Sequence, residues 1–314
     1  MKFIYKKMYR GSPEVFGKTA VLLGGDSAER NISLQSGTAI VEALRNKGVD
    51  VIAIDAQTDW VKQLSDAAIE RAFIALHGPG GEDGKVQAVL ETLNIPYTGS
   101  GHAASAIGMD KRLTKLIWRD MALPTPKSLT LKHNSQWSEC LQLLGGEVFI
   151  KPVHEGSSIG MNCAATPEEM QRAFAEAAKY DLDVIAEQRI VGKEYTVVIL
   201  GERVLPIIEL LPKNSFYDFD AKYVSVETEY LCPASLPSAQ QKQLETLALD
   251  AFHAVGCKGW GRVDVMLSNN GEFHLLEVNT VPGMTNHSLV PIAAKAVGLD
   301  FDDLVLEILC QTLA

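Results

Sequence analysis

The chain of 314 residues is long enough for two or three compact units, each with its own core. Its net charge of −10 argues against a general surface for nucleic acid or anionic membranes, because such surfaces need an excess of lysine and arginine. No apolar run reaches the ~18–20 residues of a membrane span, and the N-terminus lacks the apolar segment of a secretory signal. The five cysteines form no C-x-x-C pair. We therefore expect a cytoplasmic protein whose thiols are reduced.

Residues 16–107 are predicted to form a first α/β unit, preceded by a loose, basic extension of residues 1–15. Short apolar segments at residues 19–24, 49–54 and 71–77 read as strands, and the helix-length stretches between them predict a parallel sheet. The helix expected at residues 31–47 has Ile32, Gln35, Ala39 and Ala43 at helical spacing. Glu29 and His77 follow two of the strands, at the sheet edge where ligands bind.

Residues 108–191 predict a second, smaller unit with a helix at 111–121 and strands at 147–152 and 184–189. Thr166 and Pro167 are typical of the start of a helix, which we expect to run to about residue 180. Lys151 ends a buried strand and precedes a glycine- and serine-rich loop at 155–160, whose backbone N–H groups suit phosphate oxygens. An ordinary turn explains this loop about equally well, and the loop has no Walker A pattern.

Three other charged residues indicate a nucleotide site only when they are considered together. Lys111 precedes a helix and Lys222 lies in a polar loop, and each alone is more often a solvated surface charge. Glu187 ends a strand, where it would either accept the ribose hydroxyls of a nucleotide or remain a surface carboxylate.

Residues 192–314 are rich in predicted strands, at 194–200, 203–209 and 261–279, with helices at 238–255 and at the C-terminus. Residues 268–271 have the composition of a hairpin turn, which would pair Leu267 with Glu272 and Asp264 with Leu275. Alternation along the two strands then places one polar set on a single face: Arg262, Asp264, Glu277 and Asn279. The opposite face would carry the core, with Val263, Val265, Leu276 and Val278.

This polar face predicts a magnesium site. Two carboxylates and an amide oxygen are ligands that suit Mg²⁺, which commonly completes its shell with substrate phosphates. An adjacent arginine suits a transferring phosphoryl group. The alternative is a solvated face on which Arg262 simply pairs with Asp264 or Glu277.

Several stretches of the sequence match the motifs of one known family. They are AERNIS (residues 28–33), HGPGGEDG (77–84), MDK (109–111), IKP (150–152), EGSSIGM (155–161), FYDFDAKY (216–223) and residues 259–288, which include EVNTVPGMT (277–285). Together and in this order they resemble the D-alanine–D-alanine ligases, over nearly the whole chain beyond residue 18. The resemblance implies an ATP-grasp fold: a parallel-sheet, Rossmann-like first domain, a small central domain and a C-terminal mixed-sheet domain. It also implies a homodimer and the ATP-dependent joining of two D-alanine molecules, through an acyl phosphate, for peptidoglycan synthesis.

For the nucleotide, the resemblance implies that Lys111, Lys151 and Lys222 contact phosphates, with Ser157 and Ser158 in the loop between them. Glu187 and Glu194 would hold the ribose, and the backbone near Gln188 and Ile190 would read adenine. The apolar walls would be Phe149, Phe216, Met266 and Leu276. Two Mg²⁺ ions, with Mn²⁺ as a possible substitute, would bind Asp264, Glu277 and Asn279, with Glu277 bridging.

For the amino acids, the resemblance implies that Glu29 binds the ammonium of the first D-alanine, with His77 close by. Ser288 and Leu289 would bind the second D-alanine. Arg262 and the backbone N–H of Gly283 would stabilise the tetrahedral oxyanion. Ser157 and Tyr223 would connect the central loop and the lid to Glu29.

An acyl phosphate hydrolyses in water, so the site needs a lid, and we expect the polar, aromatic loop at residues 212–229 to provide it. A D-alanine–D-lactate ligase is the nearest alternative, but Tyr223 favours the dipeptide because related depsipeptide makers often replace that tyrosine. A dinucleotide-binding dehydrogenase is disfavoured because the first strand is not followed by G-x-G-x-x-G. A catalytically inactive nucleotide-binding regulator would need a broken metal set, which is intact here.

Overall fold

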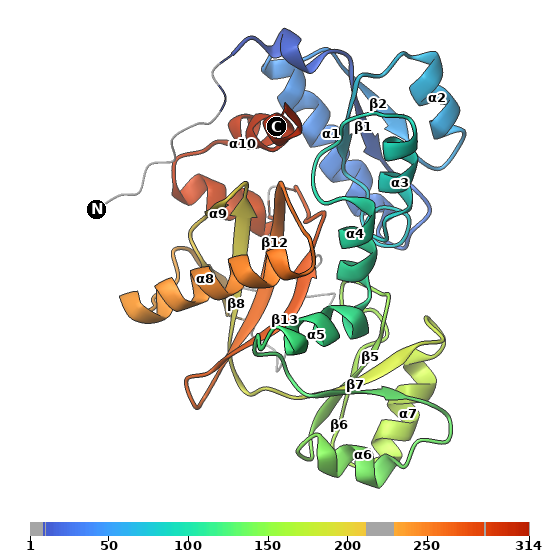
Figure 1. Ribbon diagram of the computed structural model, residues 1–314, viewed down its shortest axis with the longest axis vertical. Coiled ribbons are helices and arrows are strands. Elements are labelled where there is room, and N and C mark those ends of the chain that lie inside the picture. The colour runs from blue at the N-terminus through green and yellow to red at the C-terminus, as the bar shows by residue number, and fades with distance from the viewer. Residues whose placement is uncertain (1–8, 10, 212–228, 286, 314) are drawn as a thin grey trace.

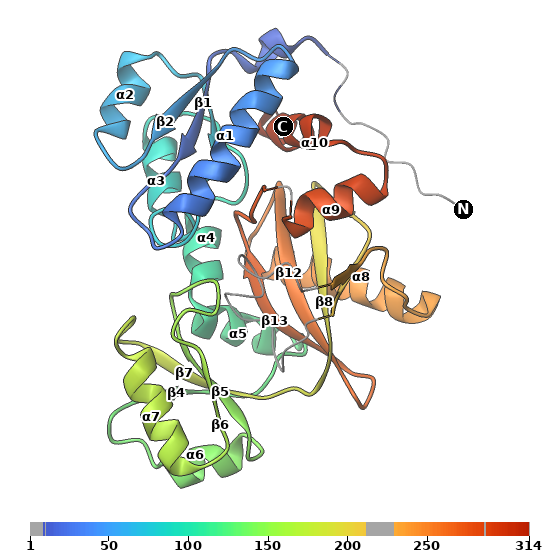
Figure 2. The same cartoon turned by 180° about the vertical axis from the view of Figure 1, so that it is seen from behind.

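The computed structural model describes residues 9, 11–211, 229–285 and 287–313. Within these residues the strands form three sheets, which are named the first, central and third sheet by their order in the sequence. Along the long axis of the molecule, the third sheet lies between the first sheet and the central sheet (Figures 1 and 2). The predicted lid lies almost entirely outside the described residues, together with Phe216, Lys222 and Tyr223.

The first sheet is parallel, as predicted, and has the order β2-β1-β3. Its strands are β1 (Thr19–Leu23), β2 (Val51–Asp55) and β3 (Arg71–Ile74). The connecting helices are α1 (Arg30–Asn46), α2 (Trp60–Asp66) and α3 (Lys85–Thr92). All five residues of β1 are buried because the strand is central in the sheet and helices cover it.

Helix α1 buries only part of the predicted face: Ala43 is buried, and Ile32 and Ala39 are half-buried. Gln35 is exposed, and the buried face contains Ser33, Ser36 and Gly37 ahead of larger apolar residues. Small residues are needed there because the helix lies very close to β1: a Cβ atom on Gly37 would stand 2.4 Å from Cβ of Leu23. Apolar spacing alone could not reveal a contact that depends on the absence of a side chain.

The central sheet is antiparallel, with the order β4-β7-β5-β6. It consists of β4 (Ser128–Leu131), β5 (Val148–Pro152), β6 (Asn162–Ala164) and β7 (Val184–Gln188), packed against α6 (Trp137–Leu143) and α7 (Pro167–Ala177). Thr166 begins α7 with a full capping box: its side chain accepts from the backbone N–H of Glu169, whose own carboxylate returns to the Thr166 N–H. The predicted start of this helix is therefore confirmed.

The third sheet has the order β11-β10-β8-β12-β13, with β9 paired to β8. Its strands are β8 (Gly192–Leu200), β9 (Arg203–Val204), β10 (Ile208–Leu211), β11 (Glu229–Leu231), β12 (Trp260–Ser268) and β13 (Phe273–Asn279). Every described pair is antiparallel, so this sheet is not the mixed sheet that was predicted. The tight turns between β8 and β9 and between β12 and β13 each reverse the chain, so these neighbours run in opposite directions.

Helices cover both faces of the third sheet. One face packs on α8 (Ser238–Ala254), α4 (His102–Met109) and α5 (Lys111–Asp120), with Trp118 of α5 fully buried among its residues. The other face meets α9 (Leu289–Ala296), which lies behind the sheet in Figure 1 and in front of it in Figure 2. Helix α5 falls in the predicted central segment of the sequence, yet its core contact is with the third sheet.

The hairpin of β12 and β13 has a bulge that the prediction did not contain. Asp264 pairs with Glu277 and Leu267 with Phe273, in place of Leu275 and Glu272. The register shifts after Asp264, so one extra residue of β13 stands between two paired positions.

The bulge changes which leucine faces the core. Leu276, predicted in the core, lines a cavity, and Leu275 is fully buried in its place. The predicted shared face of Arg262, Asp264, Glu277 and Asn279 is confirmed, because Arg262 pairs directly with Asn279 and Asp264 with Glu277.

The two ends of the described chain pack beside the first sheet. Helix α10 (Phe301–Cys310) lies next to α1, and its apolar residues share one core with β1 and β3 (Figure 1). The short helices η1 (Pro13–Phe16) and η3 (Gln311–Leu313) flank this core. Arg71 of β3 donates to the backbone of Phe16 and of Thr312.

The predicted extension is not loose in its described part. Tyr9 packs its ring 5.0 Å from that of Phe16, centroid to centroid. Its backbone N–H also donates to Glu307 of α10. No helix in the described ranges is both long enough and apolar enough to span a membrane.

Candidate active site

Two cavities adjoin where the three sheets meet, and Gly156 lines both of them. The larger has a volume of about 560 Å³ and lies between the central sheet and the third sheet. The smaller, of about 60 Å³, lies between the carboxyl edge of the first sheet, the central loop and the end of β13. A large and a small compartment with a shared wall suit a nucleotide and a small substrate that react together.

The larger cavity contains the described residues that were predicted for a nucleotide, with one exception. Its lining includes Lys111, Phe149, Lys151, Ser158, Glu187, Gln188, Ile190, Glu194, Met266 and Leu276. Ser157 is the exception, because it lines the smaller cavity.

The glycine- and serine-rich loop has an unusual backbone. Ser157 and Ser158 both have positive φ, at 52° and 60°, a left-handed conformation that residues with a side chain rarely adopt. The backbone N–H of Ile159 donates to the oxygen of Gly156 at 3.1 Å, so the two serines occupy the middle of a tight turn, and turns of this kind can direct backbone N–H groups at an anion. Lys111 donates to the backbone oxygen of Glu155 at 2.5 Å, which brings its ammonium to the start of the loop. The loop is therefore a turn by its backbone, and the nearby lysine is the feature that fits phosphate binding.

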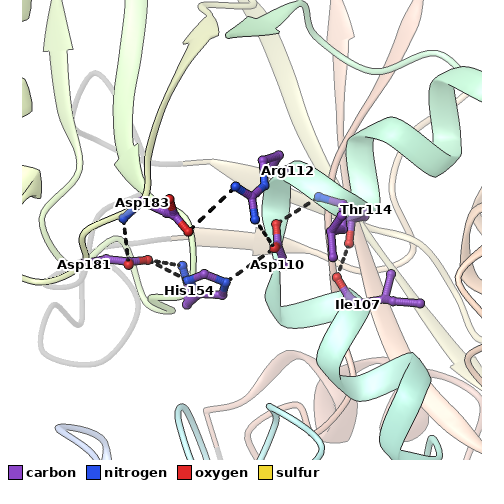
Figure 3. Close-up of polar contacts among 8 residues, drawn as sticks. Ile107, Asp110, Arg112, Thr114, His154, Asp181 and Asp183 are labelled. Carbon is purple, nitrogen blue, oxygen red and sulfur yellow. Dashed lines mark hydrogen bonds and ion pairs between the residues drawn. The ribbon is translucent and has the colours of Figure 1, made fainter. Parts of the chain in front are cut away.

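A polar network fixes the start of helix α5, which carries Lys111. Asp110 caps the helix and binds Arg112 at 3.0 Å and His154 at 3.4 Å (Figure 3). His154 also contacts Asp181 at 2.8 Å, on the loop that enters β7. The network therefore ties α5 to two loops of the central unit and fixes where Lys111 stands.

Glu187 is buried between two lysines and is not a surface carboxylate. Its two carboxylate oxygens lie 2.6 Å from Nζ of Lys115 and 2.8 Å from Nζ of Lys151. Burial raises the pKa of a carboxyl group, but attraction to both lysines outweighs burial and lowers the pKa of Glu187. Burial opposes the charge of Lys151 as well, yet the Glu187 carboxylate keeps the pKa of Lys151 above its usual value. Lys115 was not among the predicted site residues.

The acidic hairpin forms a wall between the two cavities. Arg262 donates twice to Asp264, at 2.8 Å for each bond, and Asn279 donates to the same carboxylate at 3.0 Å. The ion pair expected under the alternative interpretation is therefore present. Asp264 is only 6 % exposed, whereas Arg262, Glu277 and Asn279 are half-buried, and Asp264 and Glu277 both line the larger cavity. Thr196 of β8 lies opposite Asp264, donates to it, and was not predicted.

This donor set fits a magnesium ion bound together with phosphate. No group of three or more His, Cys, Asp or Glu side chains within the described ranges is arranged to hold a metal on its own. Asp264 and Glu277 are directly paired carboxylates, and Asn279 adds one amide on the same face. Mg²⁺ is usually bound through one or two carboxylates plus substrate phosphates, so a set this small is sufficient beside a phosphate site.

Glu29 lies in the smaller cavity, before the first turn of α1, and is 5 % exposed. Its carboxylate accepts a hydrogen bond from Oγ of Ser157 at 2.5 Å. His77 lies close by, held by the backbone oxygen of Val281 at 3.0 Å and by Ser36 at 3.3 Å. Burial lowers the pKa of His77, so the imidazole is neutral at pH 7 although Glu29 is near.

Glu82 is a second carboxylate in the smaller cavity, and it was missed as a site residue. It accepts backbone hydrogen bonds from Gly78 at 2.7 Å and Val281 at 3.4 Å. Burial, with the nearby charge of Glu29, raises the pKa of Glu82 to about 8. A sequence signal was available, because Glu82 is one of the two acidic residues inside the HGPGGEDG stretch.

The remaining predicted residues also meet in the smaller cavity, which is lined by Arg262, Gly283, Ser288 and Leu289. Oγ of Ser288 accepts from the backbone N–H of Thr285 at 2.9 Å. A Cβ atom on Gly283 would stand 2.9 Å from the same oxygen, so only glycine fits without displacing the serine. The lining of the cavity thus combines two carboxylates with a guanidinium, a hydroxyl and a glycine backbone, which suits a zwitterion.

Comparison with known proteins gives one consistent result. The family description "D-ala D-ala ligase C-terminus" matches residues 117–310, and "D-ala D-ala ligase N-terminus" matches residues 18–71 and 63–100. A D-alanine–D-alanine ligase of Saccharophagus degradans is 54% identical over 313 residues, which cover 100% of both chains.

Solved structures agree with the sequence comparison. A D-alanine–D-alanine ligase of Bacillus anthracis superimposes with a TM-score of 0.84 at 33% identity, covering 94% of this chain and 97% of that one. The same enzyme complexed with ATP gives a TM-score of 0.83 at 30% identity, again covering 94% and 97% of the two chains.

Proposed function

Because the chain belongs to the D-alanine–D-alanine ligase family, we propose that it joins two D-alanine molecules to D-alanyl-D-alanine, converts ATP to ADP and phosphate, and supplies peptidoglycan synthesis. The observation that carries this proposal is the pair of adjoining cavities. One has lysines and an acidic hairpin for ATP, the other has Glu29 for an ammonium group, and they share a wall at Gly156.

ATP occupies the larger cavity in this proposal. Lys111 and Lys151 bind its phosphates, together with the backbone of the loop at 155–160. The ribose binds Glu194, and adenine lies against Phe149, Met266 and Leu276. Glu187 has both oxygens occupied by lysines, so we assign it to positioning Lys151 and leave the ribose to Glu194. Asp264, Glu277 and Asn279 would hold two magnesium ions, which when bound neutralise charge on the phosphate oxygens.

The first D-alanine binds with its ammonium at Glu29 and its carboxylate towards the larger cavity. A carboxylate cannot be attacked by an amine directly, because oxide is too poor a leaving group. One carboxylate oxygen therefore attacks the γ-phosphorus of ATP, the bond to ADP breaks, and an acyl phosphate forms. Lys222 contributes to charge stabilisation in this proposal and lies outside the described residues.

The second D-alanine binds its carboxylate at Ser288, beside Leu289. Its deprotonated amine attacks the carbonyl carbon of the acyl phosphate. Arg262 and the backbone N–H of Gly283 stabilise the tetrahedral oxyanion, and phosphate leaves as the amide forms. We further propose a cytoplasmic homodimer whose lid at 212–229 excludes water.

The decisive assay measures phosphate release from Mg-ATP by the purified protein. D-alanine should trigger release with formation of the dipeptide, and L-alanine should not. Offering D-alanine and D-lactate together across a range of pH separates the dipeptide ligase from a D-alanine–D-lactate ligase. Phosphate release that does not depend on D-alanine would refute the proposed function.

A further inference from the structure

Lys115 is a fully buried lysine that lines neither the larger nor the smaller cavity. It lies one helical turn after Lys111 on α5, and its side chain points to the interior. Its ammonium contacts Glu187 at 2.6 Å and the hydroxyl of Thr125 at 2.9 Å. Thr125 in turn donates to the backbone of Leu275 in β13, so Lys115 joins α5, β7 and the hairpin strand.

The buried cluster has an unequal count of charges. One carboxylate, Glu187, serves two ammonium groups, Lys115 and Lys151. A buried ion is costly unless a group of opposite charge pairs with it. Glu187 and Lys151 would already form a pair, so the burial of Lys115 beside them calls for an explanation. Lys115 faces the protein interior, whereas Lys151 faces the cavity. Burial lowers the pKa of Lys115, and the attraction of Glu187 opposes this effect. Lys115 thus shares the Glu187 carboxylate with Lys151, whose ammonium stands at the cavity wall, where Glu194 and Glu277 also attract it.

We propose that Lys115 is a positioning residue that neutralises Glu187 and thereby leaves the charge of Lys151 available for the phosphates of ATP. Without Lys115, Glu187 would pair with Lys151 alone, and the two charges would cancel beside the cavity. The inference rests on the proposed function, in which Lys151 binds phosphate. It adds that this role depends on a lysine that never contacts the nucleotide.

The test compares the dissociation constants of ATP and adenosine for the full chain at fixed Mg²⁺. Both ligands share the nucleoside, so their ratio isolates the contribution of the phosphates. In Lys115→Met we expect ATP binding to weaken roughly ten- to hundredfold, the size expected when a unit charge nearby is no longer balanced. Adenosine binding should stay within about twofold, because no atom of Lys115 reaches the cavity.

Two further variants separate charge from shape. Lys115→Arg keeps the charge and should keep most of the preference for ATP over adenosine. Thr125→Val removes the hydroxyl partner of Lys115 and leaves all three charges, so it should also keep the preference. If Lys115→Met does not fold, Lys115→Gln replaces it, because glutamine removes the charge and can still hydrogen-bond Glu187.

Equal weakening of ATP and adenosine would overturn the inference, since it would mean that Lys115 only maintains the shape of the site. An unchanged ratio in the uncharged variant would overturn it as well. The proposed function is judged separately, by D-alanine-dependent phosphate release in the unaltered protein.

Discussion

Glu29 is a buried carboxylate that lies on the far side of Gly156 from the nucleotide cavity. We expect Glu29→Gln to impair use of the first D-alanine far more than binding of ATP. Removing one partner of a buried ion pair costs ~3–5 kcal/mol, and the ammonium of D-alanine would lose its counter-ion. The apparent KM of each substrate checks this. A defect confined to ATP would contradict the assignment.

Glu277 faces Asp264 across the hairpin and lines the nucleotide cavity. In Glu277→Gln we expect ligation to be abolished while the protein still folds, because loss of a metal-bridging carboxylate removes several kcal/mol of transition-state stabilisation. Activity titrated against Mg²⁺, with thermal melting alongside, provides the measurement. Glu272→Gln is the matched control, since Glu272 is an exposed carboxylate at the turn of the same hairpin. Near-normal activity with unchanged Mg²⁺ dependence in Glu277→Gln would rule out the metal site.

Glu82 should make the free energy of unfolding depend on pH. Its pKa rises from an ordinary 4.5 to about 8 in the folded protein, so in this window the folded chain holds a proton that the unfolded chain has lost. Stability must then fall as the pH rises from about 4.5 to 8. Glu82→Gln cannot ionise, and we expect this fall to disappear from a series of thermal melts.

His77 provides an internal reference for that experiment. Burial lowers its pKa, so it costs stability as the pH drops below its ordinary value of 6.5. This acid-side loss should remain in both proteins. Parallel pH profiles for Glu82→Gln and the unaltered chain would show that Glu82 has no such shift.

At the scale of residues, the sequence singled out Lys151 and Asp264 by their residue types and neighbours, and Glu29 by the family resemblance. The structure places all three at the two adjoining cavities, and their roles in binding stay predictions. Lys115 and Thr196 were missed because their roles exist only through contacts with other elements, at Glu187 and Asp264. Nothing local distinguishes a lysine that is buried behind a site from one that is exposed on a helix.

Among the elements, the strands and helices that bear the site could be predicted because their periodicity is clear. The parallel first sheet and the β12–β13 hairpin follow from apolar runs and turn composition. The bulge at Leu276 did not follow, because strict alternation cannot show that a residue has been inserted. It sends Leu276 and Glu277 to the same cavity, although regular alternation would separate them.

Helix α1 offers a test of close packing between elements. Gly37→Ala would place its new methyl group 2.4 Å from Cβ of Leu23, so the helix must move away from β1. We expect a loss of ~1–3 kcal/mol, typical of overpacking in a core. Urea denaturation gives the value. Thr38→Ala, at the next and exposed position, should change stability by no more than about 0.5 kcal/mol, and an equal loss in both variants would point to helix propensity instead.

The cores of the molecule differ in whether their residues come from one continuous stretch of the chain or from distant segments. The core of the central unit draws its buried residues only from positions 131–186. The core around the first sheet also contains residues from α9 and α10, including Leu304 and Ile308. Sequence order suggested three consecutive domains, but it could not show that α10 packs against α1, because that contact joins opposite ends of the chain.

These cores predict different behaviour in fragments. A fragment of residues 1–107 keeps α1, α2 and α3 but lacks α9 and α10, which contribute buried residues to its core, so we expect no cooperative unfolding transition in circular dichroism. A fragment of about residues 124–191 keeps its whole core and should fold more readily. Joining residues 287–314 to the first fragment through a flexible linker should restore its transition. Cooperative melting of residues 1–107 alone would show that α10 is dispensable.

The position of α10 also bears on how the protein is made. A ribosome adds ~5–20 residues per second, so synthesis of 314 residues takes roughly 15 to 60 s. The central unit can close as soon as its own residues have emerged. The first sheet, although synthesised earliest, shares its core with α9 and α10, which are synthesised last. We therefore expect the N-terminal third to complete its core after the central unit and to expose apolar surface until synthesis ends.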